Sequence, residues 1–192
     1  TYSGTITLDK PALITTGLAT GSHLTFSGVI SGAGGITAMN GASTGTFTNN
    51  ITLSNSANSF SGSVTVQRGV LSTLGTNLIV ANVADGGVNS ALGASGSAAS
   101  NLVLDGGTLQ YTGATASTDR GYTITALGGT IDASGSGALT ITGDMASAAT
   151  SGTATLRLSG ANTANNTLGG KITNGGGTNV TAVTKAGAGK WV

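Results

Sequence analysis

The chain has 192 residues, of which 34 are glycine and none is cysteine, and only 7% are charged. The net charge of +1 excludes the basic surface of a nucleic-acid-binding protein and the basic clusters that attach proteins to anionic membranes. The lack of cysteine excludes disulfides, thiol catalysis and Cys-ligated metals. Hydrophobic residues at 38% and a mean hydropathy of +0.24 exclude a disordered chain. Because glycine and threonine disfavour helices, the composition predicts an all-β protein.

Short strands with alternating aliphatic and polar residues recur along the chain, with glycine-rich turns between them. In chain order, the expected inward-facing pairs are Ile6 and Leu8, Leu24 and Phe26, Val64 and Val66, Leu139 and Ile141, and Leu156 and Leu158. A period of two places these side chains on a buried face and the intervening threonines on the opposite one. No apolar run reaches the ~18 residues of a membrane helix, so we expect no membrane insertion by this segment.

Internal repeats favour a solenoid over a sandwich or a barrel. Three pairs of segments align: 1–8 with 59–66, 21–28 with 137–143, and 106–113 with 128–135. The last two segments begin 22 residues apart, which is the length of one coil of a β-solenoid. At roughly 21 residues per coil, the chain is expected to form about nine coils, a rod of about 43 Å.

The repeated residues resemble a known family, the passenger-associated repeats of bacterial autotransporters, which are surface proteins exported by type V secretion. Five motifs carry the resemblance, in the family's order: Ile30-Ser-Gly-Ala-Gly-Gly-Ile36, residues 51–71, Leu104-Asp-Gly-Gly-Thr-Leu109, Leu156-Arg-Leu-Ser-Gly-Ala-Asn162, and Thr184-Lys-Ala-Gly-Ala-Gly-Lys-Trp-Val192. Phe60 replaces the tyrosine that is usual in the family, and one extra residue lies near Asn55.

The resemblance implies a right-handed parallel β-helix that is exported across two membranes and displayed on the bacterial cell surface, attached to the outer membrane. Such a solenoid folds coil by coil, because each coil contacts mainly its neighbours. We expect residues 1–192 to form a single β-solenoid segment. In the family, the motif that closes this chain at Trp191-Val192 usually precedes one like Thr1-Tyr-Ser-Gly4. The two ends therefore indicate one tile of a longer passenger that repeats at roughly 140 residues.

Few residues are candidates for catalysis or for metal binding. His23 is the only histidine, and alternation places it outward beside Thr25. Asp105 and Asp132 are 27 residues apart, so they are the pair that a polysaccharide-degrading β-helix enzyme would use, but Asp105 lies in a turn-forming Asp-Gly-Gly sequence. Residues 128–132 lack the spacing of a calcium-binding β-roll. We expect no catalytic residue, no cofactor and no metal site.

Asparagines and aromatic residues are expected to have structural roles. Six asparagines are expected to bond turn backbone or to form stacked ladders: Asn49, Asn50, Asn58, Asn162, Asn165 and Asn166. Phe26, Tyr2 and Phe60 are expected in the core or at coil corners, and Trp191 at an inward strand position of a continuing rod.

The expected function is structural: a protease-resistant spacer or fibre segment on the bacterial surface. Its expected partner is itself, by end-to-end stacking or as a continuation of the same chain. A second hypothesis is an adhesin module that recognises surface glycans, host surfaces or the same protein on another cell. A third is a polysaccharide-degrading β-helix enzyme.

Overall fold

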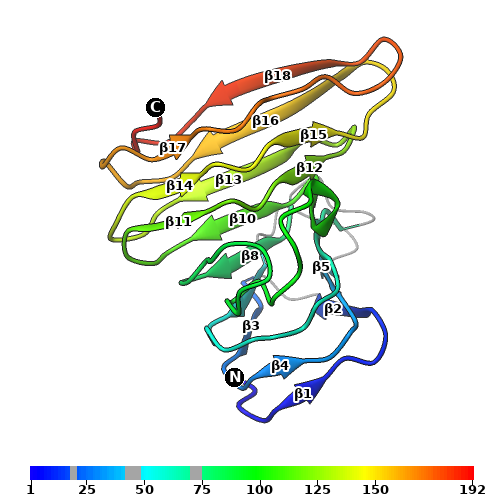
Figure 1. Ribbon diagram of the computed structural model, residues 1–192, viewed down its shortest axis with the longest axis vertical. Helices are drawn as coiled ribbons and strands as arrows, with labels where there is room; N and C mark the ends of the chain where they lie inside the picture. Colours follow the sequence, from blue (N-terminus) through cyan, green and yellow to red (C-terminus); the bar gives the residue numbers. More distant parts are fainter. Residues whose placement is uncertain (18–20, 42–48, 70–74) are drawn as a thin grey trace.

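The computed structural model describes residues 1–17, 21–41, 49–69 and 75–192. The strands pair in parallel and wind into a β-solenoid, with the N-terminus at one end of the stack and the C-terminus at the other (Figure 1). In the described residues, the one helical element is a 3₁₀ turn at Ala99–Asn101. The fold is therefore the all-β solenoid that the sequence predicts. No described helix has the length and hydropathy to cross a membrane.

Each coil has three faces. Face one is a seven-stranded sheet of β3 (His23–Phe26), β6 (Asn50–Leu53), β8 (Asn77–Val80), β10 (Thr108–Tyr111), β13 (Gly129–Ala133), β16 (Thr153–Ser159) and β18 (Val180–Lys185). Face two is a six-stranded sheet of β2 (Ala12–Thr16), β5 (Ile36–Asn40), β7 (Val64–Gln67), β9 (Leu102–Asp105), β12 (Tyr122–Ile124) and β15 (Met145–Ser147).

The third face is divided into two separate sheets. The lower one pairs β1 (Ile6–Thr7) with β4 (Ile30–Ser31), and the upper one contains β11 (Ala116–Thr118), β14 (Leu139–Ile141) and β17 (Thr167–Leu168). Both sheets occupy the same place in their coils, after a face-one strand and before a face-two strand. The chain between β8 and β9 separates them, so the solenoid is continuous on two faces and interrupted on the third.

Columns of identical or similar side chains run along the solenoid, because parallel pairing in register places each residue above its counterpart. One inward column of face one contains Leu24, Ile51, Leu78, Leu109, Ile131 and Leu158. Such columns form one hydrophobic core through the stack. The expected inward residues from Val64 onward are buried, whereas Ile6, Leu24 and Phe26 are only partly buried because the first coil has a neighbour on one side.

The number of coils differs from the expectation. Six pairings join the seven strands of face one, which makes about six turns rather than nine. Four of these pairings join residues 27 positions apart, as His23 does with Asn50. The 22-residue period occurs only between Thr108 and Thr130. The extra residues lengthen the turns at the corners, where the sequence alternation carries no signal.

The alignment of residues 1–8 with 59–66 does not correspond to equal positions in the coil. Ile6 lies on the third face beside Ile30, whereas Val64 lies on face two. Tyr2 is 47% exposed and packs only against Phe26, at 6.2 Å between ring centroids, whereas Phe60 is completely buried. A short motif of aromatic residue, Ser-Gly and aliphatic residue fits more than one corner. The end of the 51–71 motif, at Val70 and Leu71, lies outside the described residues.

Candidate functional site

The carboxylates that the sequence offered for catalysis lie apart. Asp105 ends β9 on face two, where its Oδ1 accepts a hydrogen bond of 2.5 Å from the Thr125 hydroxyl. Asp132 lies in β13 on face one, where its Oδ1 accepts hydrogen bonds from Gln110 and Ser134. These carboxylates bond neighbouring coils on different sheets, so the structure does not support them as an acid and base pair.

His23 lies exposed on β3, as alternation predicts, and its register partner is Asn50. Within the described ranges, no three His, Cys, Asp or Glu side chains come close enough together to hold a metal ion.

Buried asparagines connect the backbones of successive coils. The Asn58 Oδ1 accepts a hydrogen bond from the Ile30 amide in the coil below, at 2.9 Å, and its Nδ2 donates to the Ala91 carbonyl above, at 3.3 Å. Asn166 has the same role, because it accepts from the Leu139 amide and donates to the Lys190 carbonyl. The prediction that these asparagines satisfy turn backbone is confirmed, and the side chains act as staples between coils.

Asn49 and Asn162 also bond the backbone. Asn49 accepts from the Ser22 amide and Asn162 donates to the Gly135 carbonyl, in each case one coil away. Asn50 stacks between His23 and Asn77 in an outward ladder of face one. Asn165 is exposed.

Replacing Asn58 with alanine is expected to lower the free energy of unfolding by about 2 kcal/mol, because it leaves a buried N–H and a buried C=O without partners. Urea unfolding followed by far-UV circular dichroism measures this change. The exposed Asn89 provides the matched control, and Asn89→Ala should stay within about 0.5 kcal/mol of the wild type. Equal losses in the two variants would show that the staple contributes nothing.

An irregular region interrupts the stack between β8 and β9. Here Val64 pairs with Leu102, a step of 38 residues instead of the usual 27. An ideal Cβ on Gly86 would lie 2.2 Å from the Ser97 nitrogen, so the chain leaves and re-enters the coil at nearly one point. Residues 87–96, the junction loop, are therefore an insertion into the third face.

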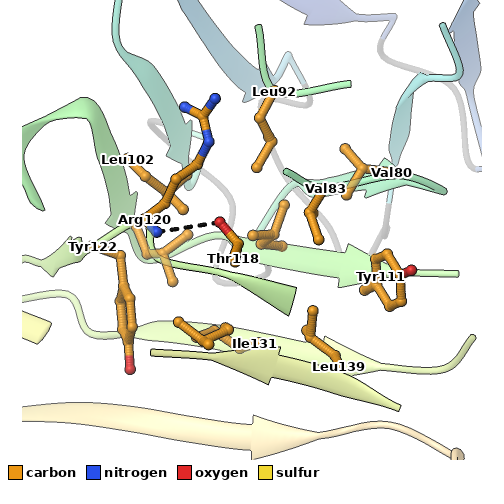
Figure 2. Close-up of a pocket in the computed structure, with 13 residues that line it drawn as sticks. Val80, Val83, Leu92, Leu102, Tyr111, Thr118, Arg120, Tyr122, Ile131 and Leu139 are labelled. Carbon is orange, nitrogen blue, oxygen red and sulfur yellow. Dashed lines mark hydrogen bonds between the residues drawn. The ribbon is translucent and has the colours of Figure 1, made fainter. Parts of the chain in front are cut away.

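The junction loop folds inward, onto the coil below it. Ser90, Ala91, Leu92 and Ser95 are almost completely buried. The Ala94 amide donates to the Phe60 carbonyl at 2.8 Å. Leu92 reaches the small apolar cavity that lies between the two parts of the solenoid (Figure 2).

Arg120 holds the junction loop from above. It follows β11, is 3% exposed, and extends toward Leu92 in Figure 2. Its Nε donates to the Ala84 carbonyl at 3.0 Å, its Nη1 to the Ser95 hydroxyl at 2.8 Å, and its Nη2 to the Gly93 carbonyl at 2.9 Å. Burial lowers the pKa of Arg120, against the raising effect of the Asp119 and Asp85 charges.

Asp85 and Asp119 close the same corner. The Asp85 Oδ1 accepts from the Asp119 amide at 2.9 Å, and the Asp119 Oδ1 accepts from the Gly86 amide at 2.7 Å. Both carboxylates are thus bonded to backbone. The sequence analysis missed this cluster, whose one visible signal was a long stretch without inward alternation between Val80 and Leu102.

Tyr122 lines the cavity on the other side, and its side chain extends away from Arg120 in Figure 2. It is 1% exposed and its hydroxyl has no hydrogen-bond partner. Burial raises the pKa of Tyr122 above its ordinary value of 10.0. The unfolded state therefore loses this proton first, and the stability that the neutral tyrosine contributes falls as the pH rises above about 10.

Replacing Tyr122 with phenylalanine is expected to raise the free energy of unfolding by about 1 kcal/mol at pH 7, since it removes a buried hydroxyl that has no partner. The variant should also lose less stability than the wild type between pH 9 and pH 11, a range chosen around the ordinary tyrosine pKa of about 10. Urea midpoints across this range measure both effects. The half-exposed Tyr2 is the control, and Tyr2→Phe should change neither. A variant less stable than the wild type at pH 7 would contradict the prediction.

With the solenoid and its staples described, the chain can be compared with known proteins. A curated protein that it matches is the Adhesin BmaC autotransporter of Brucella suis biovar 1 (strain 1330), with 42% identity over 142 residues. The chain is a homologue of an autotransporter adhesin. The match covers 72% of this chain but only 4% of that protein. No family model matches, and no solved structure gives a significant match.

The resemblance to autotransporter passenger repeats is thus confirmed by a named relative and by the β-solenoid. The autotransporter homologue contains the family's aromatic, Ser-Gly and aliphatic motif at Phe60 and Val64, both fully inside the core. The relative's printed name describes an adhesin rather than an enzyme.

Proposed function

We propose that this chain is a structural spacer in the passenger of an autotransporter, displayed outside the cell at the outer membrane, and that it carries no catalytic activity. The observation that carries the proposal is the stack itself. Side chains that bond at all to the next coil do so in the service of the backbone, as Asn58, Asn166 and Asp85 do. A rod of this kind sets a distance, because each coil adds about 4.8 Å to its length.

Partners of the spacer follow from its two end coils. The last strand exposes Val180 and Val183, and the first coil exposes Tyr2 and Leu13. Apolar strands with open edges favour pairing with further strands. We propose that further coils cover them, either of the same polypeptide or of a second copy of this chain.

Deleting one whole coil from the full-length polypeptide tests the spacer role. Thr130 pairs with Arg157, so removal of residues 130–156 joins Gly129 to Arg157 in register and keeps the alternation. Cells displaying the shortened protein are expected to adhere as well as the wild type at equal surface density, measured with an antibody against another part of the passenger. Loss of adhesion with intact display would overturn the spacer proposal.

The printed name of the relative favours a second candidate function, an adhesin module that contacts a surface glycan, a host surface or another copy of itself. Outward threonines of the two continuous sheets are the surface it would use. The double variant Thr65→Lys/Thr123→Lys changes face two, with Val103 between the two sites so that the new charges do not stack. The matched control Thr52→Lys/Thr130→Lys changes face one.

The two functions give different results with these variants. A spacer predicts full adhesion for both double variants. An adhesin module predicts loss for the variant of the face that binds, with the other variant unaffected, and far-UV circular dichroism shows whether each solenoid remains folded.

A further inference from the structure

The two parts of the solenoid meet differently on each face. On face one, β8 pairs with β10 in full register, and on face two β7 pairs with β9 over three residues. On the third face, the amides of Ser90 and Ala94 in the junction loop donate to the carbonyls of Asn58 and Phe60 below. The loop therefore takes the place of a strand there, and it fills the interval between the coils.

The upper attachment of the loop depends largely on one side chain. Arg120 donates to the Ala84 carbonyl at the base of the loop, and to Gly93 and Ser95 within it. The Thr118 hydroxyl donates to the same Ala84 carbonyl at 2.9 Å. A guanidinium suits this position, because its N–H groups form a rigid planar fork that bonds several acceptors at once.

Packing is weakest at the same level. The apolar cavity lies between Leu92 of the loop and Ile131 and Leu139 of the upper coils. A void removes dispersion contacts from the atoms that line it. The coupling between the parts therefore depends more on polar contacts here than where 27-residue coils stack directly.

We propose that the solenoid consists of two cooperative units, residues 1–80 and 97–192, and that the junction loop and Arg120 form a latch that makes them unfold together. In a linear array of coils, cooperativity depends on the interface between neighbours, so weakening one interface separates the units on its two sides. This inference concerns the folding of the chain and goes beyond the spacer role, so it stands whichever function is correct.

The single tryptophan makes the proposal testable. Trp191 packs against the upper unit, where its Nε1 donates to the Ser159 carbonyl at 2.8 Å, so its fluorescence reports on that unit. Far-UV circular dichroism reports on both units. In urea, the two signals of the wild-type chain are expected to follow one transition. In Arg120→Met, which keeps an unbranched side chain but no donor, the midpoints are expected to separate by about 1 M urea.

A core variant that leaves the latch intact is the control. Leu156 is completely buried in the upper unit, and Leu156→Ala should shift both signals to lower urea together. If Arg120→Met does not fold, Ser95→Ala, which removes a single acceptor of the latch, decides in its place by a smaller separation of the midpoints. Coincident transitions in the variant that decides, or separate transitions in the wild type, would overturn the proposal.

Discussion

Replacing Phe60 with alanine is expected to lower the free energy of unfolding by about 3–5 kcal/mol, the range for a buried aromatic side chain. Phe60 is completely buried where the lower coils meet the junction loop. A Cβ added to Gly93 would lie 2.8 Å from its ring, so the ring packs directly on the backbone of the loop. That backbone is held by Arg120 and cannot move in to fill the cavity.

Urea unfolding with far-UV circular dichroism measures this loss, and the chain provides its own control. Tyr2 follows the same sequence motif but is half exposed, with Phe26 as its aromatic neighbour. Tyr2→Ala is expected to cost about 1 kcal/mol. Similar losses for Phe60→Ala and Tyr2→Ala would contradict the assignment of Phe60 to the core.

Replacing Gly143 with alanine is the second large change, with an expected loss of at least about 3 kcal/mol. The new Cβ would lie 2.3 Å from the carbonyl carbon of Arg120 and 2.3 Å from the nitrogen of Gly121, which are backbone atoms of the coil below. A Cβ on Gly170 in the coil above would meet the Gly143 carbonyl oxygen at 2.0 Å. Glycines thus stack at this corner, where the coils approach too closely for any side chain.

Gly176 is the matched control for Gly143. A Cβ at Gly176 would meet no atom within 4 Å. Gly176→Ala should therefore leave stability unchanged or raise it by up to about 1 kcal/mol, through the lower entropy of the unfolded chain. Thermal unfolding of the two variants measures the difference. An equally stable Gly143→Ala would mean that the corner can open without cost.

The prediction of the fold succeeded where the pattern is local. Val64 and Val66, and Leu156 and Leu158, alternate with polar residues, and each pair points into the core. The asparagines are a further local signal, because their side chains suit turns and short contacts with backbone. Asn58 and Asn166 have this role in the structure.

The coil length and the site of the insertion were not predictable in the same way. Alternation ends at each corner, so the residues between strands give no register, and a 22-residue spacing that occurs once was extended to the whole chain. Asp105 and Asp132 show the same limit, since their 27-residue separation equals one coil but the strands that hold them belong to different sheets.

By itself, the sequence determined an all-β solenoid with an apolar interior, because a period of two and repeated glycine turns are properties of neighbouring residues. Only the tertiary structure decided that residues 87–96 turn inward and that Arg120 binds them. These contacts join residues 24 to 36 positions apart, as Arg120 does with Gly93 and Ala84. Contacts at that distance depend on how whole coils stack, which no local pattern records.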